Sequence, residues 1–260
     1  MQPSESAHWL RCRRPLDKAK LRARVLALPY AGGGASVFHA WTDDLPSDIE
    51  VRALQLPARQ DRLNERGLTS VAAAVEKVRA ALAALPAAPL LLYGHSYGSL
   101  LGFELARSLA AAGSPPLALV VGGRRAAHLP MRAPAIYALP DAAFKEELYQ
   151  RYGTPRAFLR NDELMALALP PLRADFTAHE TYEYVPLAKP LDFPIVVLRG
   201  RHDASVTADE AAAWNELTSR PGPVHEVDGG HLFVDSHRPW VLARISEVLR
   251  SVAGPGPGPV

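Results

Sequence analysis

The sequence contains little of several residue types, and each shortage narrows the class of protein. Cys12 is the only cysteine in 260 residues, so no internal disulfide can form and nothing points to an oxidising compartment. No apolar run approaches the ~20 residues of a membrane-spanning helix, and residues 1–9 lack the apolar core of a signal peptide. Positive and negative side chains nearly cancel, leaving a net charge of +2, which gives no argument for nucleic acid. We therefore expect a soluble cytoplasmic protein that binds neither membrane nor nucleic acid.

What the sequence does contain is a series of short apolar runs, the pattern of buried parallel strands. Strands are predicted at 25–29, 49–54, 90–93, 117–121, 195–200 and 224–227. Apolar residues spaced by three and four predict helices over 71–85 and 100–112. The alternation predicts an α/β fold with a mostly parallel central sheet flanked by helices. The length allows either one domain with an insertion or two domains, and the Gly-Pro tail at 253–260 predicts disorder.

Residues 94–98 read Gly-His-Ser-Tyr-Gly and lie between the apolar run at 90–93 and the helical pattern that follows. In this setting a Gly-x-Ser-x-Gly pattern predicts a sharp strand-to-helix turn that presents the serine at the edge of the sheet. The first amides of the helix would then face an oxyanion formed beside that serine. Ser96 is therefore our candidate nucleophile, and the alternative is a plain structural turn.

A glycine-rich segment at 30–36 follows the first predicted strand. It could cradle a dinucleotide or a phosphate, but Gly32-x-Gly34-x-x-Val37 lacks a third glycine, and no Gly-Lys-Ser/Thr follows. In a serine hydrolase a loop at this place supplies one amide of the oxyanion hole. We therefore assign the backbone amides of Ala31 and Tyr97 as the two donors.

An aspartate and a histidine follow the last two predicted strands. Asp203 comes just after the strand at 195–200, and His231 comes after two glycines beyond the strand at 224–227. The chain order Ser, Asp, His matches that of α/β-hydrolases and differs from the orders of trypsin and subtilisin. We therefore predict that Asp203 and His231 complete a triad with Ser96. The rivals of the same residue types, which position disfavours, are Asp192, Asp209, Asp228, His202 and His237.

Residues 124–190 break the alternation of strand and helix, because a simple helical crossover needs only about a dozen residues. The pattern predicts three short helices separated by prolines, beginning near residues 141, 162 and 172. We predict that 130–185 forms a helical lid over an acyl pocket at the carboxyl edge of the sheet. The alternative is a packing insertion remote from the site. The residues expected to contact substrate are Tyr30, Phe144, Met165 and Phe176.

Basic residues are concentrated near the N-terminus, where 11–24 carries seven of the 29 Lys and Arg residues. We interpret this segment as a solvated arm crossing the surface. The alternative is a docking patch for an acidic partner.

Taken together, these segments resemble the type II (external, editing) thioesterases that accompany nonribosomal peptide and polyketide synthetases, members of the α/β-hydrolase superfamily. The resemblance runs from about residue 9 to 250 and rests on the segments 28–33, 57–63, 94–98, 172–176, 200–203 and 229–233. It implies a single α/β-hydrolase domain over 1–260. It also implies the triad Ser96, Asp203 and His231, with no metal and no cofactor.

The resemblance further implies a monomeric enzyme that removes stalled or misprimed acyl groups from the phosphopantetheine arm of acyl or peptidyl carrier domains. A generic carboxylesterase, an acyl-CoA thioesterase, an acyltransferase and a non-catalytic carrier-binding module are the alternatives. Arg59 and Arg62 are expected to meet an acidic carrier surface. Two residues depart from the family pattern: Tyr30 replaces a common His, and Tyr97, expected to face the acyl pocket, replaces a common Met.

Overall fold

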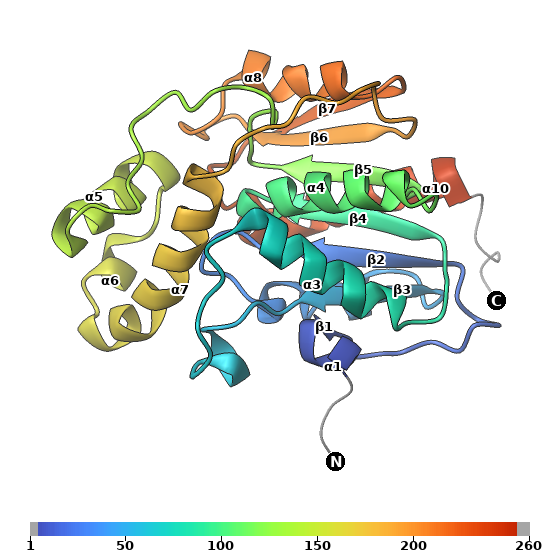
Figure 1. Cartoon of the computed structure of the whole chain (residues 1–260), viewed down its shortest axis with the longest axis horizontal. Helices are drawn as coiled ribbons and strands as arrows, with labels where there is room; N and C mark the ends of the chain where they lie inside the picture. The colour runs from blue at the N-terminus through green and yellow to red at the C-terminus, as the bar shows by residue number, and fades with distance from the viewer. Residues whose placement is uncertain (1–4, 254–260) are drawn as a thin grey trace.

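Seven strands form one sheet in the order β1-β3-β2-β4-β5-β6-β7 (Figure 1). The computed structural model describes residues 5–253. β1 runs antiparallel to β3, and the other five pairs are parallel. The predicted α/β fold with a mostly parallel sheet is therefore confirmed. The strands are β1 (Leu10–Arg11), β2 (Ala23–Leu28), β3 (Ile49–Leu54), β4 (Leu90–His95), β5 (Ala118–Gly122), β6 (Ile195–Gly200) and β7 (Pro221–Val227).

The predicted strands agree with β2 to β7 to within a few residues. β3 and β6 begin and end where predicted, whereas β7 begins earlier, at Pro221. A proline is tolerated at the start of an edge strand, because its missing N–H is not needed there. The two-residue strand β1 was not predicted. It has no periodic signal of its own and owes its place to the pairing of Leu10 with Leu54.

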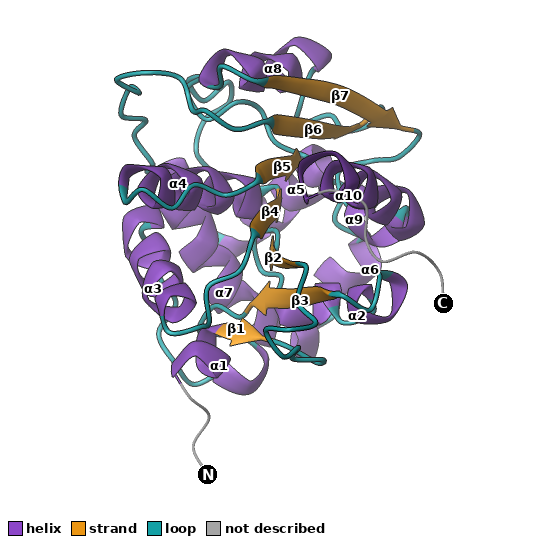
Figure 2. Ribbon diagram, turned by 90° about the vertical axis from the view of Figure 1, so that its right-hand side faces the viewer, coloured by secondary structure: helices purple, strands orange, loops and turns teal. Residues whose placement is uncertain are grey.

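Successive side chains of the central strands point to opposite faces of the sheet and build two cores. In β2, Leu26 and Leu28 pack with α3 (Val71–Ala83) and α4 (Tyr97–Ala111). Figure 2 shows these two helices on one side of the sheet, with α2 (Trp41–Asp44), α9 (Phe233–Ser236) and α10 (Arg238–Ala253) on the other. Burial of the strands on both faces explains their continuous apolar runs.

Several short helices complete the described chain. Between residues 5 and 253, no helix is long and apolar enough to cross a membrane. Ala253, which opens the tail predicted at 253–260, is the last residue of α10, and 254–260 lie outside the described residues. The short helices are α1 (Glu5–Trp9), α8 (Ala208–Ala212) and 3₁₀ helices at Ala35–Phe38, Gln60–Arg62 and Ala213–Leu217.

The insertion predicted at 130–185 contains α5 (Asp141–Tyr152), α6 (Arg156–Leu159) and α7 (Asp162–Glu180), which stand together beside the carboxyl ends of the parallel strands (Figure 1). These helices share a core distinct from the two beneath the sheet. The insertion is therefore held together by its own apolar contacts. The members of this core are Ile136, Phe144, Leu148, Leu159, Met165, Leu172 and Phe176.

α7 is one continuous helix of 19 residues, so the prediction of two helices separated by Pro170 and Pro171 is wrong. Each proline lacks the N–H that would bond to the preceding turn, which normally breaks a helix. Met165 before the prolines and Phe176 after them pack into the same core, and this shared packing holds both halves in line. Tertiary contacts thus override the local preference.

Replacing Pro170 by alanine tests this continuity. Pro170 is exposed within α7, so alanine would add a helical hydrogen bond without disturbing the core. We expect Pro170→Ala to raise the free energy of unfolding by roughly 1 kcal/mol or more, measured by chemical denaturation. Pro155→Ala is the control, because Pro155 lies before the first turn of α6, where proline costs little. Equal stabilities of Pro170→Ala and wild type would contradict a continuous helix.

Candidate active site

Ser96 lies on a tight turn between β4 and α4, with φ of +53° and ψ of −112°. Such a φ is uncommon for a residue other than glycine and costs of order 1–3 kcal/mol, so the surroundings must hold it. The Ser96 N–H donates to the Gly122 carbonyl of β5 at 2.7 Å. A Cβ added at Gly94 would lie 2.2 Å from the Gly98 carbonyl oxygen, and one at Gly98 would lie 2.0 Å from that of Leu28. Close backbone packing therefore explains both glycines of the motif.

The structure brings Ser96, His231 and Asp203 together. His231 Nε2 lies 3.0 Å from Ser96 Oγ, and His231 Nδ1 lies 2.9 Å from Asp203 Oδ2. Burial alone would raise the pKa of Asp203, but hydrogen bonds from His231 and Ser205 outweigh it and hold that pKa below its ordinary value. Asp203 is therefore ionised and fixes the imidazole with its proton on Nδ1. That tautomer leaves Nε2 free to accept the serine proton.

Ser205 is a further member of this network that the sequence analysis did not identify. Its hydroxyl donates to Asp203 Oδ1 at 2.6 Å, and its N–H donates to the same oxygen at 2.9 Å. The hydroxyl is also 3.0 Å from His231 Nδ1. A serine two residues after an aspartate is the only sequence signal, and it is weak because such local turns are common.

The rival aspartates and histidines are engaged elsewhere. The side chain of Asp228 is 78% exposed and lies 2.7 Å from His202 Nε2. Asp192 and Asp209 are exposed, and His237 lies beside the hydroxyl of Ser236 at 2.9 Å. Within residues 5–253, no three His, Cys, Asp or Glu side chains gather in the manner of metal ligands.

The glycine-rich segment is held by a buried ion pair that reaches it from the insertion. Gly32 has φ of +78°, and its N–H donates to Asp175 Oδ2 of α7 at 2.8 Å. Arg59 binds both oxygens of Asp175, at 2.7 and 2.9 Å, and donates to the Gly33 carbonyl at 2.9 Å. Because Asp175 occupies the Gly32 amide, the adjacent Ala31 amide stays our assigned oxyanion donor. The Tyr97 amide is the second, since the first amides of a helix have no partner within it.

Two cavities meet at Ser96 and His231, and both are also lined by Tyr152 and His179. The larger has a volume of about 430 Å³, and its lining is mostly apolar or glycine. The smaller has a volume of about 240 Å³, and its lining is rich in arginine. The first suits an acyl chain and the second suits a polar group. Residues of the larger cavity include Tyr30, Ala31, Leu148, Phe158, Ala168, Leu172 and Phe176.

A model of the thioesterase domain family matches residues 23–249, a range that includes every site residue described above. The chain belongs to the thioesterase family.

Named relatives agree with this assignment. The gramicidin S biosynthesis protein GrsT of Aneurinibacillus migulanus is 37% identical over 235 residues, which cover 90% of this chain and 91% of GrsT. Thioesterase PikA5 of Streptomyces venezuelae is 37% identical over 254 residues, which cover 96% and 88%. The solved structure of BorB, the type II thioesterase of the borrelidin biosynthetic cluster, matches with a TM-score of 0.85 at 35% identity and covers 96% and 100%. The predicted resemblance to type II thioesterases is confirmed, and the protein is a hydrolase of acyl thioesters.

His95, the second residue of the thioesterase's Gly-x-Ser-x-Gly motif, holds the backbone of His231. His95 Nε2 lies 2.7 Å from the His231 carbonyl oxygen, and Nδ1 lies 3.2 Å from the Tyr93 hydroxyl. A carbonyl can only accept, so Nε2 carries the proton and the Tyr93 hydroxyl donates to Nδ1. Burial lowers the pKa of His95 to about 3, which keeps this ring neutral and the arrangement fixed.

The prediction that Arg59 and Arg62 meet a carrier at the surface is wrong, because both side chains are only 4% exposed. Arg62 binds Glu65 at 2.5 Å, donates to the Gln55 carbonyl at 2.8 Å and lies over the Trp9 ring at 4.1 Å. The buried partners of the two arginines come from α1 and α7, which lie far from this loop in the sequence. Both guanidinium groups therefore serve the interior.

The interpretation of 11–24 as a solvated arm is also wrong in part. Arg24 is buried and pairs with Glu50 at 2.6 Å, and Arg22 pairs with Asp48 at 2.7 Å. Arg13 pairs with Asp43 at 3.1 Å although its side chain is half exposed. The segment is thus fastened to β3 and to the turn before it.

Three of the residues predicted to contact substrate do not line either cavity. Phe144 and Met165 are buried in the core of the insertion. The side chain of Tyr97 is 1% exposed and packs in the core beneath α3 and α4, with its ring 6.0 Å from that of His179. The predicted positions of these three side chains in the acyl pocket are therefore wrong. Tyr30 and Phe176 do line the larger cavity.

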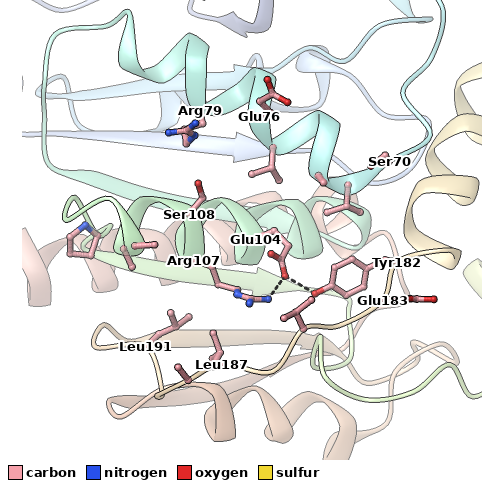
Figure 3. A pocket seen from close by; sticks show the side chains of 18 of the residues that line it. Ser70, Glu76, Arg79, Glu104, Arg107, Ser108, Tyr182, Glu183, Leu187 and Leu191 are labelled. Carbon is pink, nitrogen blue, oxygen red and sulfur yellow. Dashed lines mark hydrogen bonds and ion pairs between the residues drawn. The ribbon is translucent and has the colours of Figure 1, made fainter.

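A larger hollow of about 1020 Å³ lies away from this site, between α3, α4 and the segment 181–193 (Figure 3). Tyr182 and Arg107 both donate to Glu104 Oε1 there, at 2.5 and 2.8 Å. The hollow contains none of Ser96, Asp203 and His231, so its size does not make it the active site.

Removing both charges of the Asp175–Arg59 pair separates its effect on stability from its effect on the glycine-rich segment. Asp175→Leu alone leaves a buried guanidinium without a counter-charge and should cost about 3–5 kcal/mol of unfolding free energy. Arg59→Met/Asp175→Leu should recover most of that loss, because apolar replacement of a buried pair is often neutral. We expect the double variant to keep its KM but lose about tenfold or more in kcat, since Gly32 loses its acceptor and the Ala31 amide its fixed direction.

Chemical denaturation and steady-state hydrolysis of an acyl thioester measure the two effects. Arg22→Met/Asp48→Leu is the control, because it removes a comparable pair where β2 and β3 begin, at the opposite end of the sheet. Recovery of both stability and kcat in the Arg59→Met/Asp175→Leu variant would show that the pair has no influence on catalysis.

Proposed function

We propose that this thioesterase removes acyl groups from the phosphopantetheine arm of acyl or peptidyl carrier domains. The groups would be aberrant or stalled intermediates of polyketide or nonribosomal peptide synthesis. The observation that carries the proposal is the meeting of two unlike cavities at Ser96, one apolar and one basic. An acyl chain fits the first, and a polar arm that bears a phosphate fits the second. The names of GrsT and BorB, which refer to gramicidin S biosynthesis and the borrelidin cluster, support the same setting.

The first half of the reaction transfers the acyl group to Ser96. The serine oxygen attacks the thioester carbonyl while His231 Nε2, 3.0 Å away, takes its proton. The oxyanion accepts hydrogen bonds from the amides of Ala31 and Tyr97. The carbon–sulfur bond then breaks, and the thiolate of the arm takes the proton from His231. The products are an acyl-serine ester and the free thiol arm.

The second half hydrolyses the ester. A water molecule gives one proton to His231 as its oxygen attacks the ester carbonyl. The bond between carbon and Ser96 Oγ breaks, and Ser96 recovers its proton from His231. Asp203 stabilises the imidazolium in both halves through its 2.9 Å hydrogen bond, and Ser205 holds Asp203 in place. The acyl group leaves as a carboxylic acid.

Single substitutions test the roles assigned to the three side chains. Ser96→Ala should keep the fold and reduce hydrolysis by roughly a thousandfold or more, and it should abolish covalent labelling by a fluorophosphonate. Asp203→Asn should be similarly damaging because the imidazole loses its orientation. Asp228→Asn is the control, since Asp228 is exposed and bonded to His202. If Ser96→Ala retained activity within about tenfold of wild type, or Asp228→Asn were the damaging change, the assignment would be wrong.

The nature of the substrate is tested by presenting one acyl group on different handles. We expect kcat/KM to be highest for the acyl group on a carrier domain, lower on coenzyme A and lowest on N-acetylcysteamine, because contacts with the arm and the carrier add binding energy. Equal values on all three thioesters would favour a free-standing acyl-CoA thioesterase. Faster turnover of the matching oxygen ester would favour a carboxylesterase.

A further inference from the structure

The cavity of about 240 Å³ beside Ser96 is lined by four arginines and by no aspartate or glutamate. Arg124 and Arg125 follow β5, whereas Arg132 and Arg151 belong to the insertion. Because Ser96 and His231 line the same cavity, this positive charge is placed beside the reacting groups. Cations gathered in one cavity repel each other and favour the binding of an anion.

Two of these arginines have no ion-pair partner within residues 5–253. Arg132 pairs with Glu210 at 3.4 Å, and Arg151 pairs with Glu147. Arg124 and Arg125 form no such pair in that range, and Arg125 donates a single hydrogen bond, to the Leu129 carbonyl at 3.2 Å. The Nε of Arg124 is buried and has no hydrogen-bond partner. Buried polar groups are nearly always bonded, so this one calls for a ligand.

The carboxylates that act electrostatically on the two unpaired arginines are engaged elsewhere. Glu180, which acts on Arg124, accepts from the amides of Ile136 and Tyr137, both at 2.8 Å. Burial raises the pKa of Glu180, which makes it a poorer counter-ion. Glu210, which acts on Arg125, accepts from the Thr207 amide at 2.8 Å and also pairs with Arg132. The positive charge of the cavity is therefore not neutralised by the fold.

His179 adds a second unpartnered group to the same cavity. The residue is 7% exposed, and its Nδ1 is buried without a hydrogen-bond partner. Burial, together with the charge of Arg124, holds the pKa of His179 well below its ordinary value, so the ring is neutral. A neutral imidazole has one N–H, which can donate to an oxygen of a bound anion.

We propose that Arg124, Arg125 and His179 form an anion-binding subsite beside Ser96 that takes carboxylate or phosphate oxygens of the thioester substrate. Guanidinium groups bind such oxygens through charge-assisted and often bidentate hydrogen bonds. The inference rests on the proposed function and adds a substrate class to it. Two parts of the substrate can supply the anion: the phosphate of the pantetheine arm, or a carboxylate on a dicarboxylic acyl group.

The backbone places this subsite near the reacting carbonyl. The Ser96 N–H donates to the Gly122 carbonyl at 2.7 Å, and Arg124 follows Gly122 by two residues. The two Cα atoms of Gly122 and Arg124 are therefore within about 7 Å of each other, the length of two extended residues. An anion bound by Arg124 lies on the same substrate molecule whose thioester is at Ser96.

The test uses the full chain and four thioesters that differ only in where they carry an anion. Acetyl-pantetheine is neutral, acetyl-phosphopantetheine adds the phosphate, malonyl-pantetheine adds the carboxylate, and malonyl-phosphopantetheine carries both. We expect Arg124→Met to lower kcat/KM by about tenfold to a hundredfold for at least one anionic group, the range of a charged hydrogen bond. We expect less than about a twofold change for acetyl-pantetheine. Arg79→Met is the control, because it removes the same charge from an exposed position on α3.

The pattern of losses decides the outcome. A loss confined to the phosphorylated thioesters supports the subsite and assigns it to the arm, and a loss confined to the malonyl thioesters supports it and assigns it to the acyl group. Equal losses on all four thioesters, or no loss on any, would overturn the subsite while leaving the thioesterase function intact. Absence of wild-type activity on every thioester, carrier-bound ones included, would instead overturn the proposed function.

A binding measurement keeps the inference testable if Arg124→Met does not fold. Inorganic phosphate should inhibit wild-type hydrolysis of acetyl-pantetheine competitively, and Arg125→Met should weaken that inhibition by about tenfold. Sodium chloride at the same ionic strength controls for screening. Inhibition by phosphate no stronger than by chloride, or unchanged in Arg125→Met, would count against an anion-binding subsite.

Discussion

The contact between Gly98 and the carbonyl of Leu28 is the constraint on which the rest of the site depends. A Cβ at position 98 would come within 2.0 Å of that oxygen, so α4 can approach the end of β2 only because the residue is glycine. This approach puts the first amides of α4 beside the segment that starts at Pro29. Ser96, between the strand and the helix, is then forced into its φ of +53°. Nucleophile and oxyanion donors are thus positioned by one close packing of backbone.

The Asp175–Arg59 pair extends this arrangement to the insertion. Asp175 belongs to α7, whereas Arg59 follows β3, and together they hold Gly32 and Gly33 by hydrogen bonds to one amide and one carbonyl. A change in the position of α7 would therefore move the oxyanion segment or break a buried ion pair. Breaking it is costly, because either partner alone is a buried charge. The position of α7 and the geometry of the glycine-rich segment are consequently coupled.

The sequence was informative where its signals are local and silent where partners are distant. The strands at 49–54 and 195–200 and the turn at Ser96 follow from short apolar runs and two glycines, and they were predicted closely. Arg59 reads as a solvated loop residue because its partner Asp175 is 116 residues away. Phe144 and Met165 have the spacing of a buried helix face, but spacing does not say which of two cavities or cores that face meets. α7 continues through Pro170 because of packing that no local rule contains.

Arg59 and Arg124 show two outcomes for a guanidinium taken out of water. Arg59 has both oxygens of Asp175 and the carbonyls of Pro57 and Gly33, so its burial is compensated within the fold. The Nε of Arg124 has no partner, and the cost of burying it is not repaid by the protein. Such a cost persists where a bound molecule supplies the missing partner, and Arg124 lies in the cavity that contains Ser96. A substrate that fills this cavity therefore completes hydrogen bonding that the fold leaves open, and its binding is linked to stability as well as to turnover.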